Sequence, residues 1–128
     1  MNTKYLMIAS AAVMGVFGIA LSFFPIEILN YLGISSDFPY TILLQLTGAL
    51  FLGFAMMNWM AKAVLIGGIY ARPLAMGNFM HFVVGCLALV KVAINNSGSL
   101  YTWIAATLYF VFAVSFGIVA FTAPVKKV

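Results

Sequence analysis

Four long apolar runs constrain this chain more than any other feature of its sequence. They cover residues 5–24, 39–60, 73–94 and 100–121. Each is about 20 residues long, which is what an α-helix needs to cross a hydrocarbon core of roughly 30 Å. The runs are continuous and do not alternate with period two, which excludes the pattern of an outer-membrane barrel. The sequence therefore predicts an all-α membrane protein with four spanning helices.

Composition supports the same interpretation. Hydrophobic residues make up 66% of the 128 residues, and only 6% are charged. A water-soluble domain of this size needs a polar surface that so few charged side chains cannot supply. The net charge of +4 comes from basic residues at the predicted helix ends, where it reports membrane orientation. We therefore expect no nucleic-acid partner.

A short amphipathic helix is predicted between the first two spans, over residues 25–33, a stretch too short to cross the membrane. Its apolar stripe has helical spacing and consists of Pro25, Ile28, Leu29 and Leu32. Pro25 suits the first helical position, and Gly33 suits the position just beyond the end. We expect this helix to lie along the outer interface or to cap the bundle. Residues 35–39, Ser-Ser-Asp-Phe-Pro, then signal the start of the second span.

The first apolar run has a face of small residues at spacings of four, three and four. These residues are Ala11, Gly15, Gly18 and Ser22. Small side chains at this spacing allow a neighbouring helix to approach closely. The alternative for this run is a signal peptide, because Ala20-Leu21-Ser22 fits a small-x-small cleavage site. The run exceeds the roughly 7–15 residues of a signal-peptide core, which favours a spanning helix.

Basic residues predict the orientation. One side of the predicted topology holds Lys4, Lys62, Arg72, Lys126 and Lys127, and the other holds Lys91, Glu27 and Asp37. The positive-inside rule then places both termini, and the loop between the second and third spans, on the cytoplasmic side of the membrane. Lys62 and Arg72 are also candidates for binding an anionic lipid head group, although topology alone would produce the same basic collar.

Four polar side chains inside the spans are candidate ligand-binding residues. Asn78 and His81 share one face of the third span, while Asn58 and Gln45 lie on the second. Polar groups within a membrane are costly and suggest a function. One interpretation is a polar pocket between the second and third spans. The other is that these side chains satisfy one another through interhelical hydrogen bonds.

Catalytic or metal chemistry within one chain is not expected. The chain has one histidine, one cysteine and two carboxylates, and a metal site needs more ligands than one span supplies. Both carboxylates fall on the outer side, whereas His81 lies about eight residues, or roughly 12 Å, from the cytoplasmic end of its helix. Cys86 is about 140° around the helix from His81, so we interpret it as a small buried apolar residue. We expect no enzyme activity and no cofactor.

Three segments carry a family resemblance. The first span leads into F-P-x-x-x-L-x-x-L-G (Phe24 to Gly33), N-W closes the second span, and R-P-x-x-x-G-N-x-x-H opens the third. With its length and four spans, the chain resembles the small bacterial four-helix membrane proteins that include the DoxX-like families. The resemblance implies the membrane fold and a place in the bacterial inner (cytoplasmic) membrane, and it carries over no activity or functional residue.

Together these observations predict one domain, residues 1–128, with four helices running up-down-up-down and a short outer helix between the first two. The leading functional hypothesis is an accessory subunit or a binder of a lipid or other hydrophobic ligand. The face that carries Asn78 and His81 would contact the ligand or the partner. The alternative is an oligomeric channel or transporter for a small solute or ion. Expected partners are membrane lipids, further copies of the chain, or a larger membrane complex.

Overall fold

The structure is a computed structural model that describes residues 2–63, 71–95 and 99–122. This part of the chain forms five helices and no strand. They are α1 (Thr3–Phe23), α2 (Pro25–Tyr31), α3 (Phe38–Ala61), α4 (Arg72–Asn95) and α5 (Leu100–Phe121). All except α2 are long and apolar enough to span a membrane. The prediction of a multi-pass, all-helical chain is confirmed, and each helix end falls within two residues of its predicted position.

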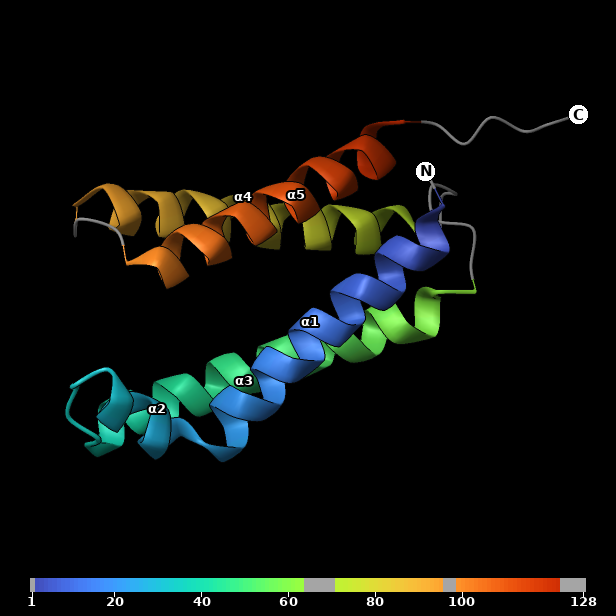
Figure 1. Cartoon of the computed structure of the whole chain (residues 1–128). Coiled ribbons are helices and arrows are strands. Elements are labelled where there is room, and N and C mark those ends of the chain that lie inside the picture. Colours follow the sequence, from blue (N-terminus) through green and yellow to red (C-terminus); the bar gives the residue numbers. More distant parts are fainter. Residues whose placement is uncertain (1, 64–70, 96–98, 123–128) are drawn as a thin grey trace, which may run out of the picture. The chain divides into compact units, whose positions relative to one another are not determined.

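The chain divides into two compact units, residues 1–63 and 64–128. The first contains α1, α2 and α3, which we call the N-terminal hairpin. The second contains α4 and α5, which we call the C-terminal hairpin (Figure 1). The predicted up-down bundle of four helices would combine both units, and it stays a prediction.

Close backbone contact holds α1 against α3 in the N-terminal hairpin. A Cβ atom added at Gly48 would lie 2.7 Å from the backbone nitrogen of Ser22, and one added at Gly18 would lie 2.9 Å from the backbone nitrogen of Leu52. Real Cβ atoms do not approach that closely, so both positions require glycine for this packing. The prediction that the small face of the first span allows close approach is confirmed. Since the end of α1 meets the early part of α3, the two helices are antiparallel.

The short helix α2 ends in a Schellman motif. The amide of Ile34 donates to the carbonyl of Leu29 at 2.9 Å, and the amide of Gly33 donates to that of Asn30 at 3.1 Å. Gly33 has φ +68°, a left-handed conformation that glycine adopts without steric cost. The predicted roles of Pro25 at the start and Gly33 beyond the end are confirmed. The place of α2 at the outer interface stays a prediction.

Only part of the predicted apolar stripe of α2 is covered. Pro25 and Leu29 are buried, whereas Leu32 is 59% exposed. The helix packs on both α1 and α3 within its own unit, and it carries Glu27 in its first turn. An acidic residue there complements the partial positive charge of the helix N-terminus.

Polar residues organise the start of α3. Asp37 is the N-cap and Pro39 stands in the first turn, as predicted. The Asp37 carboxylate does not cap the helix; it accepts a hydrogen bond from the Ser35 hydroxyl. The Thr41 hydroxyl donates to the Ser36 carbonyl at 3.0 Å. These local bonds fix the turn that leads from α2 into the second long helix.

Aromatic rings form the core of the C-terminal hairpin. The Phe82 ring on α4 stacks on Phe112 and Phe116 of α5, with centroids 4.8 and 5.7 Å apart, and meets Tyr109 edge-on at 5.2 Å. Gly85 makes room for Tyr109, because a Cβ atom there would lie 2.7 Å from its Cδ1 atom. Phe82 and Phe116 are fully buried. Rings at this spacing contribute about 0.5–1.5 kcal/mol per pair beyond the area they bury.

Contacts along the hairpin show that α4 and α5 are antiparallel. Near the start of α4, the Phe79 ring meets Phe121, at the end of α5, with centroids 5.4 Å apart. Further along α4, the Cys86 thiol lies 3.7 Å from the carbonyl oxygen of Ala106, in the first half of α5. Cys86 is buried, so the interpretation of this residue as a buried apolar side chain is confirmed.

Candidate functional site

Asn58 is buried near the end of α3, where it bonds to α1. Its Nδ2 donates to the Ser10 Oγ at 3.0 Å and approaches the Met14 sulfur at 3.9 Å. The Ser10 hydroxyl in turn donates to the Met7 carbonyl at 3.1 Å. Both Ser10 and Asn58 are fully buried. The result is a chain of hydrogen bonds that fixes α1 and α3 at this end of the N-terminal hairpin.

Asn78 and His81 lie one turn apart on α4. Asn78 is fully buried, and its Nδ2 donates to the Leu74 carbonyl in the preceding turn at 3.0 Å. The His81 Nε2 lies 3.4 Å from the Tyr109 hydroxyl of α5, a long hydrogen bond whose donor depends on the histidine tautomer. The His81 ring also meets Phe82 edge-on, with centroids 5.1 Å apart. His81 thus extends the aromatic core of its hairpin.

Gln45 differs from the other candidates. It is exposed on α3, and within the described ranges its side chain makes no hydrogen bond. It lies 13 residues before Asn58 on the same helix, which is about 20 Å along the axis. The two do not form one local cluster.

The four predicted ligand-binding residues are therefore divided between the units. Asn58 and Gln45 belong to the N-terminal hairpin, and Asn78 and His81 belong to the C-terminal hairpin. The predicted polar pocket would draw on both units and stays a prediction. The hydrogen bonds described above form within single hairpins and join none of the four residues to another: Asn58 bonds to Ser10, Asn78 to its own helix, and His81 to Tyr109.

Sequence reasoning missed Ser10 and Tyr109, which are the partners of Asn58 and His81. A signal existed for each. Ser10 shares the α1 face of Met7 and Met14 by helical spacing, so a polar side chain there needs a partner inside the protein. Tyr109 is the tenth residue of α5, well inside the helix, whereas interfacial tyrosines lie near helix ends.

The two candidate head-group residues also fall in different units. Lys62 is the C-cap of α3, and its Nζ lies 3.0 Å from the centroid of the Trp59 ring, a cation–π contact. Arg72 is the first residue of α4 and is exposed. The predicted bend at Gly67-Gly68 between them lies outside the described residues.

An apolar cleft opens between α4 and α5, with a volume of about 260 Å³. Its lining is Phe79, Val83, Cys86, Leu87, Phe110, Ala113, Val114 and Gly117. Neither Asn78 nor His81 contributes to it. The Cys86 thiol is the only polar side-chain group in this lining, and it already points to the Ala106 carbonyl. The cleft therefore offers space for an apolar group and almost no hydrogen bonding.

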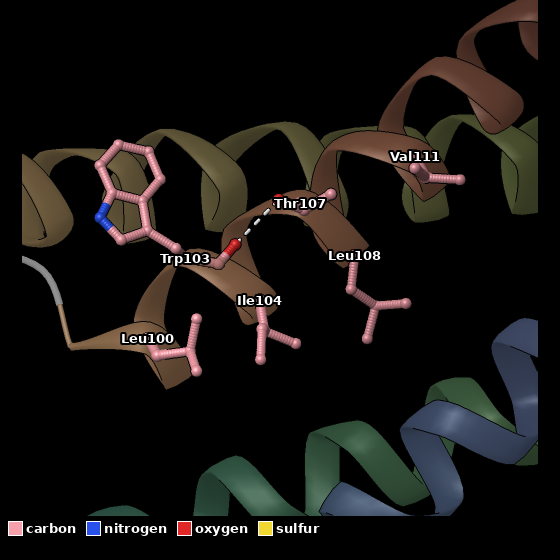
Figure 2. Close-up of a pocket in the computed structure, with 6 residues that line it drawn as sticks. All are labelled: Leu100, Trp103, Ile104, Thr107, Leu108 and Val111. Carbon is pink, nitrogen blue, oxygen red and sulfur yellow. Dashed lines mark hydrogen bonds between the residues drawn. The ribbon is translucent and has the colours of Figure 1, made fainter.

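One face of α5 lines a second apolar pocket (Figure 2). The face consists of Leu100, Trp103, Ile104, Thr107, Leu108 and Val111. Its hydroxyl group, on Thr107, donates to the Trp103 carbonyl at 2.9 Å, the bond drawn dashed in Figure 2. Because this bond satisfies the hydroxyl hydrogen within the helix, the face is suited to apolar contact.

No group of three or more histidine, cysteine, aspartate or glutamate side chains converges among the described residues. No family model, curated protein or solved structure matches the chain. The resemblance to DoxX-like families therefore stays a prediction.

Proposed function

We propose that this chain is a non-enzymatic multi-pass protein of the bacterial inner membrane that binds a lipid or another hydrophobic ligand. The supporting observation is the α4–α5 cleft, which is apolar throughout apart from a thiol already directed at a carbonyl. Ligand pockets for whole small molecules usually measure about 300–1,000 Å³. A cleft of about 260 Å³ suits part of a long ligand, such as one acyl chain.

The proposal also covers orientation and the role of the polar residues. Both termini face the cytoplasm, as expected from the distribution of basic residues. Asn78 bonds within α4 to the Leu74 carbonyl, and His81 links α4 to α5 through Tyr109. A resemblance to DoxX-like families is compatible with this role, because it implies no catalysis. The alternative, an oligomeric channel or transporter, is one outcome of the experiment below.

Native mass spectrometry of the full-length protein tests the proposal, because it reports retained ligand and oligomeric state together. Val114 lines the cleft and is 46% exposed, so Val114→Phe should fill the cleft without burying new volume in the core. We expect wild type to retain lipid and Val114→Phe to retain less. Val84, 57% exposed on α4 and outside the cleft, gives the control Val84→Phe, which should retain the wild-type amount.

Two results would contradict the proposal. Wild-type protein that carries no lipid or other apolar ligand in any gentle detergent rules out the binding function. A stable ring-like oligomer that conducts ions in lipid bilayers, and carries no bound lipid, would favour the channel alternative.

A further inference from the structure

A third apolar pocket is a groove between α1 and α3 in the N-terminal hairpin, with a volume of about 330 Å³. It is lined by Ala11, Ala12, Leu52, Ala55, Met56 and Trp59. Ala11 and Ala55 are buried and form its floor, whereas Met56 and Trp59 are 62% and 50% exposed and form its rim. Three alanines opposite longer side chains leave the space between the helices unfilled.

The groove ends beside a positive charge. Trp59 closes one end of the groove, and the Lys62 ammonium lies 3.0 Å from the centroid of its ring. Among the described residues, Lys62 forms no ion pair. The chain has only two carboxylate side chains, Glu27 and Asp37. Asp37 stands at the opposite end of α3, about 38 Å from Lys62 along the helix axis, and Glu27 belongs to α2 at that same end.

The dimensions match one leaflet of a bilayer. Leu52 and Trp59 are seven residues apart on α3, so the groove extends about 10 Å from the lysine end of the helix. Half of a hydrocarbon core of roughly 30 Å is about 15 Å. An acyl chain that starts near Lys62 would therefore follow the groove through about two thirds of its leaflet.

We propose that this groove binds an anionic phospholipid, with an acyl chain between α1 and α3 and the head-group phosphate on the Lys62 ammonium. The inference rests on the proposed lipid-binding function and names the lipid class for a site in the other hairpin. Apolar contact alone cannot select a lipid, because any acyl chain offers it. Selection must come from the charge, and one basic residue near an anionic surface is worth about 1 kcal/mol, or about fivefold.

Native mass spectrometry of the full-length protein in a detergent containing equal amounts of phosphatidylglycerol and phosphatidylcholine tests this inference. We expect wild type to retain phosphatidylglycerol about fivefold more than phosphatidylcholine. Lys62→Gln should reduce this ratio to near one, while Lys62→Arg should keep it. Lys91→Gln removes the same charge from an exposed position on α4 and should leave the ratio unchanged.

A second pair of variants tests the groove itself. Ala12→Leu should fill it and lower the amount of retained phosphatidylglycerol at least threefold. Ala9→Leu makes the same change at an exposed position on α1 that does not line the groove, and should retain the wild-type amount. Circular dichroism checks that all variants keep their helical content.

The outcomes separate this inference from the function on which it rests. Lipid retained by wild type without preference for either class overturns the anionic site and leaves the proposed function standing. Equal losses of preference in Lys62→Gln and Lys91→Gln overturn it too, because net charge would then explain the selection. Equal retention of phosphatidylglycerol by Ala12→Leu and Ala9→Leu overturns the assignment of the groove as the binding site. Wild type without any lipid overturns both proposals.

Discussion

A buried amide in a membrane helix must find its hydrogen-bond partners within the protein, because lipid offers none. The Asn58 amide donates a hydrogen bond to the Ser10 hydroxyl, and the Ser10 hydroxyl donates one to the Met7 carbonyl. Each hydrogen in this chain of groups has an acceptor, with donors and acceptors alternating from α3 to the backbone of α1. Removing one member leaves another without its partner.

A double-mutant cycle on Ser10→Ala and Asn58→Leu measures this pair apart from the other contacts of either residue. We expect a coupling free energy of about 0.6–1.7 kcal/mol, the range for hydrogen bonds between membrane helices. The measurement is the free energy of reversible unfolding in mixed micelles containing a denaturing detergent. Additive effects of the two substitutions would contradict the bond. Gln45→Leu, at an exposed position, is the control and should change stability by less than about 0.5 kcal/mol.

At the residue scale, the sequence indicated three of the polar side chains that form hydrogen bonds, but it did not predict the partners of those bonds. Asn58, Asn78 and His81 stand out because polar residues are rare in such helices. Their partners were sought among one another, whereas Asn58 bonds to Ser10, and His81 meets a tyrosine. A serine hydroxyl can donate to a carbonyl of its own helix, and a tyrosine is expected at the membrane interface. A single sequence therefore gives little reason to select either residue as a partner.

At the scale of elements, two glycines on α3 differ in the space around them: Gly48 has no room for a side chain, whereas Gly53 does. Gly48 faces α1 so closely that a Cβ atom would lie 2.7 Å from the Ser22 backbone nitrogen and 3.0 Å from the Gly18 carbonyl oxygen. Backbone atoms cannot move aside as a side chain can. Gly53, five residues later, has nothing within 4 Å of its added Cβ position.

These two positions form a matched pair for testing the helix contact. Gly48→Ala should lower the free energy of unfolding by about 1–3 kcal/mol, the usual cost of overpacking. Gly53→Ala should be neutral or raise it by up to about 1 kcal/mol, because alanine favours the helix. Unfolding in mixed micelles measures both. Equal effects of the two substitutions would show that α1 and α3 do not approach each other as described.

The helices themselves could be predicted closely because length and apolar content alone define them. Their pairing within the N-terminal hairpin could be predicted only in part. The spacing of Gly15 and Gly18 identifies the face of α1 that makes contact, but several small residues of α3 could have met it. The opposition of Gly48 to Ser22 depends on the exact turn through α2, which spacing along one helix does not report.

For the whole molecule, the charge distribution leads to a topological prediction. Five of the six basic residues are predicted to lie on the cytoplasmic side, which should place the C-terminus there. A green fluorescent protein fused to the C-terminus should therefore fluoresce, and alkaline phosphatase fused at the same point should be inactive. The same phosphatase fused after Asn95 should be active. Activity in the reverse pattern would contradict the orientation.

The division into two hairpins has a spectroscopic consequence. The chain contains two tryptophans; Trp59 belongs to α3 and Trp103 to α5. Each hairpin thus carries its own intrinsic fluorophore. Trp103→Phe leaves emission from the N-terminal hairpin alone, and Trp59→Phe leaves emission from the C-terminal hairpin alone. Stopped-flow fluorescence of these two variants can time the folding of each half of the protein separately, without any attached dye.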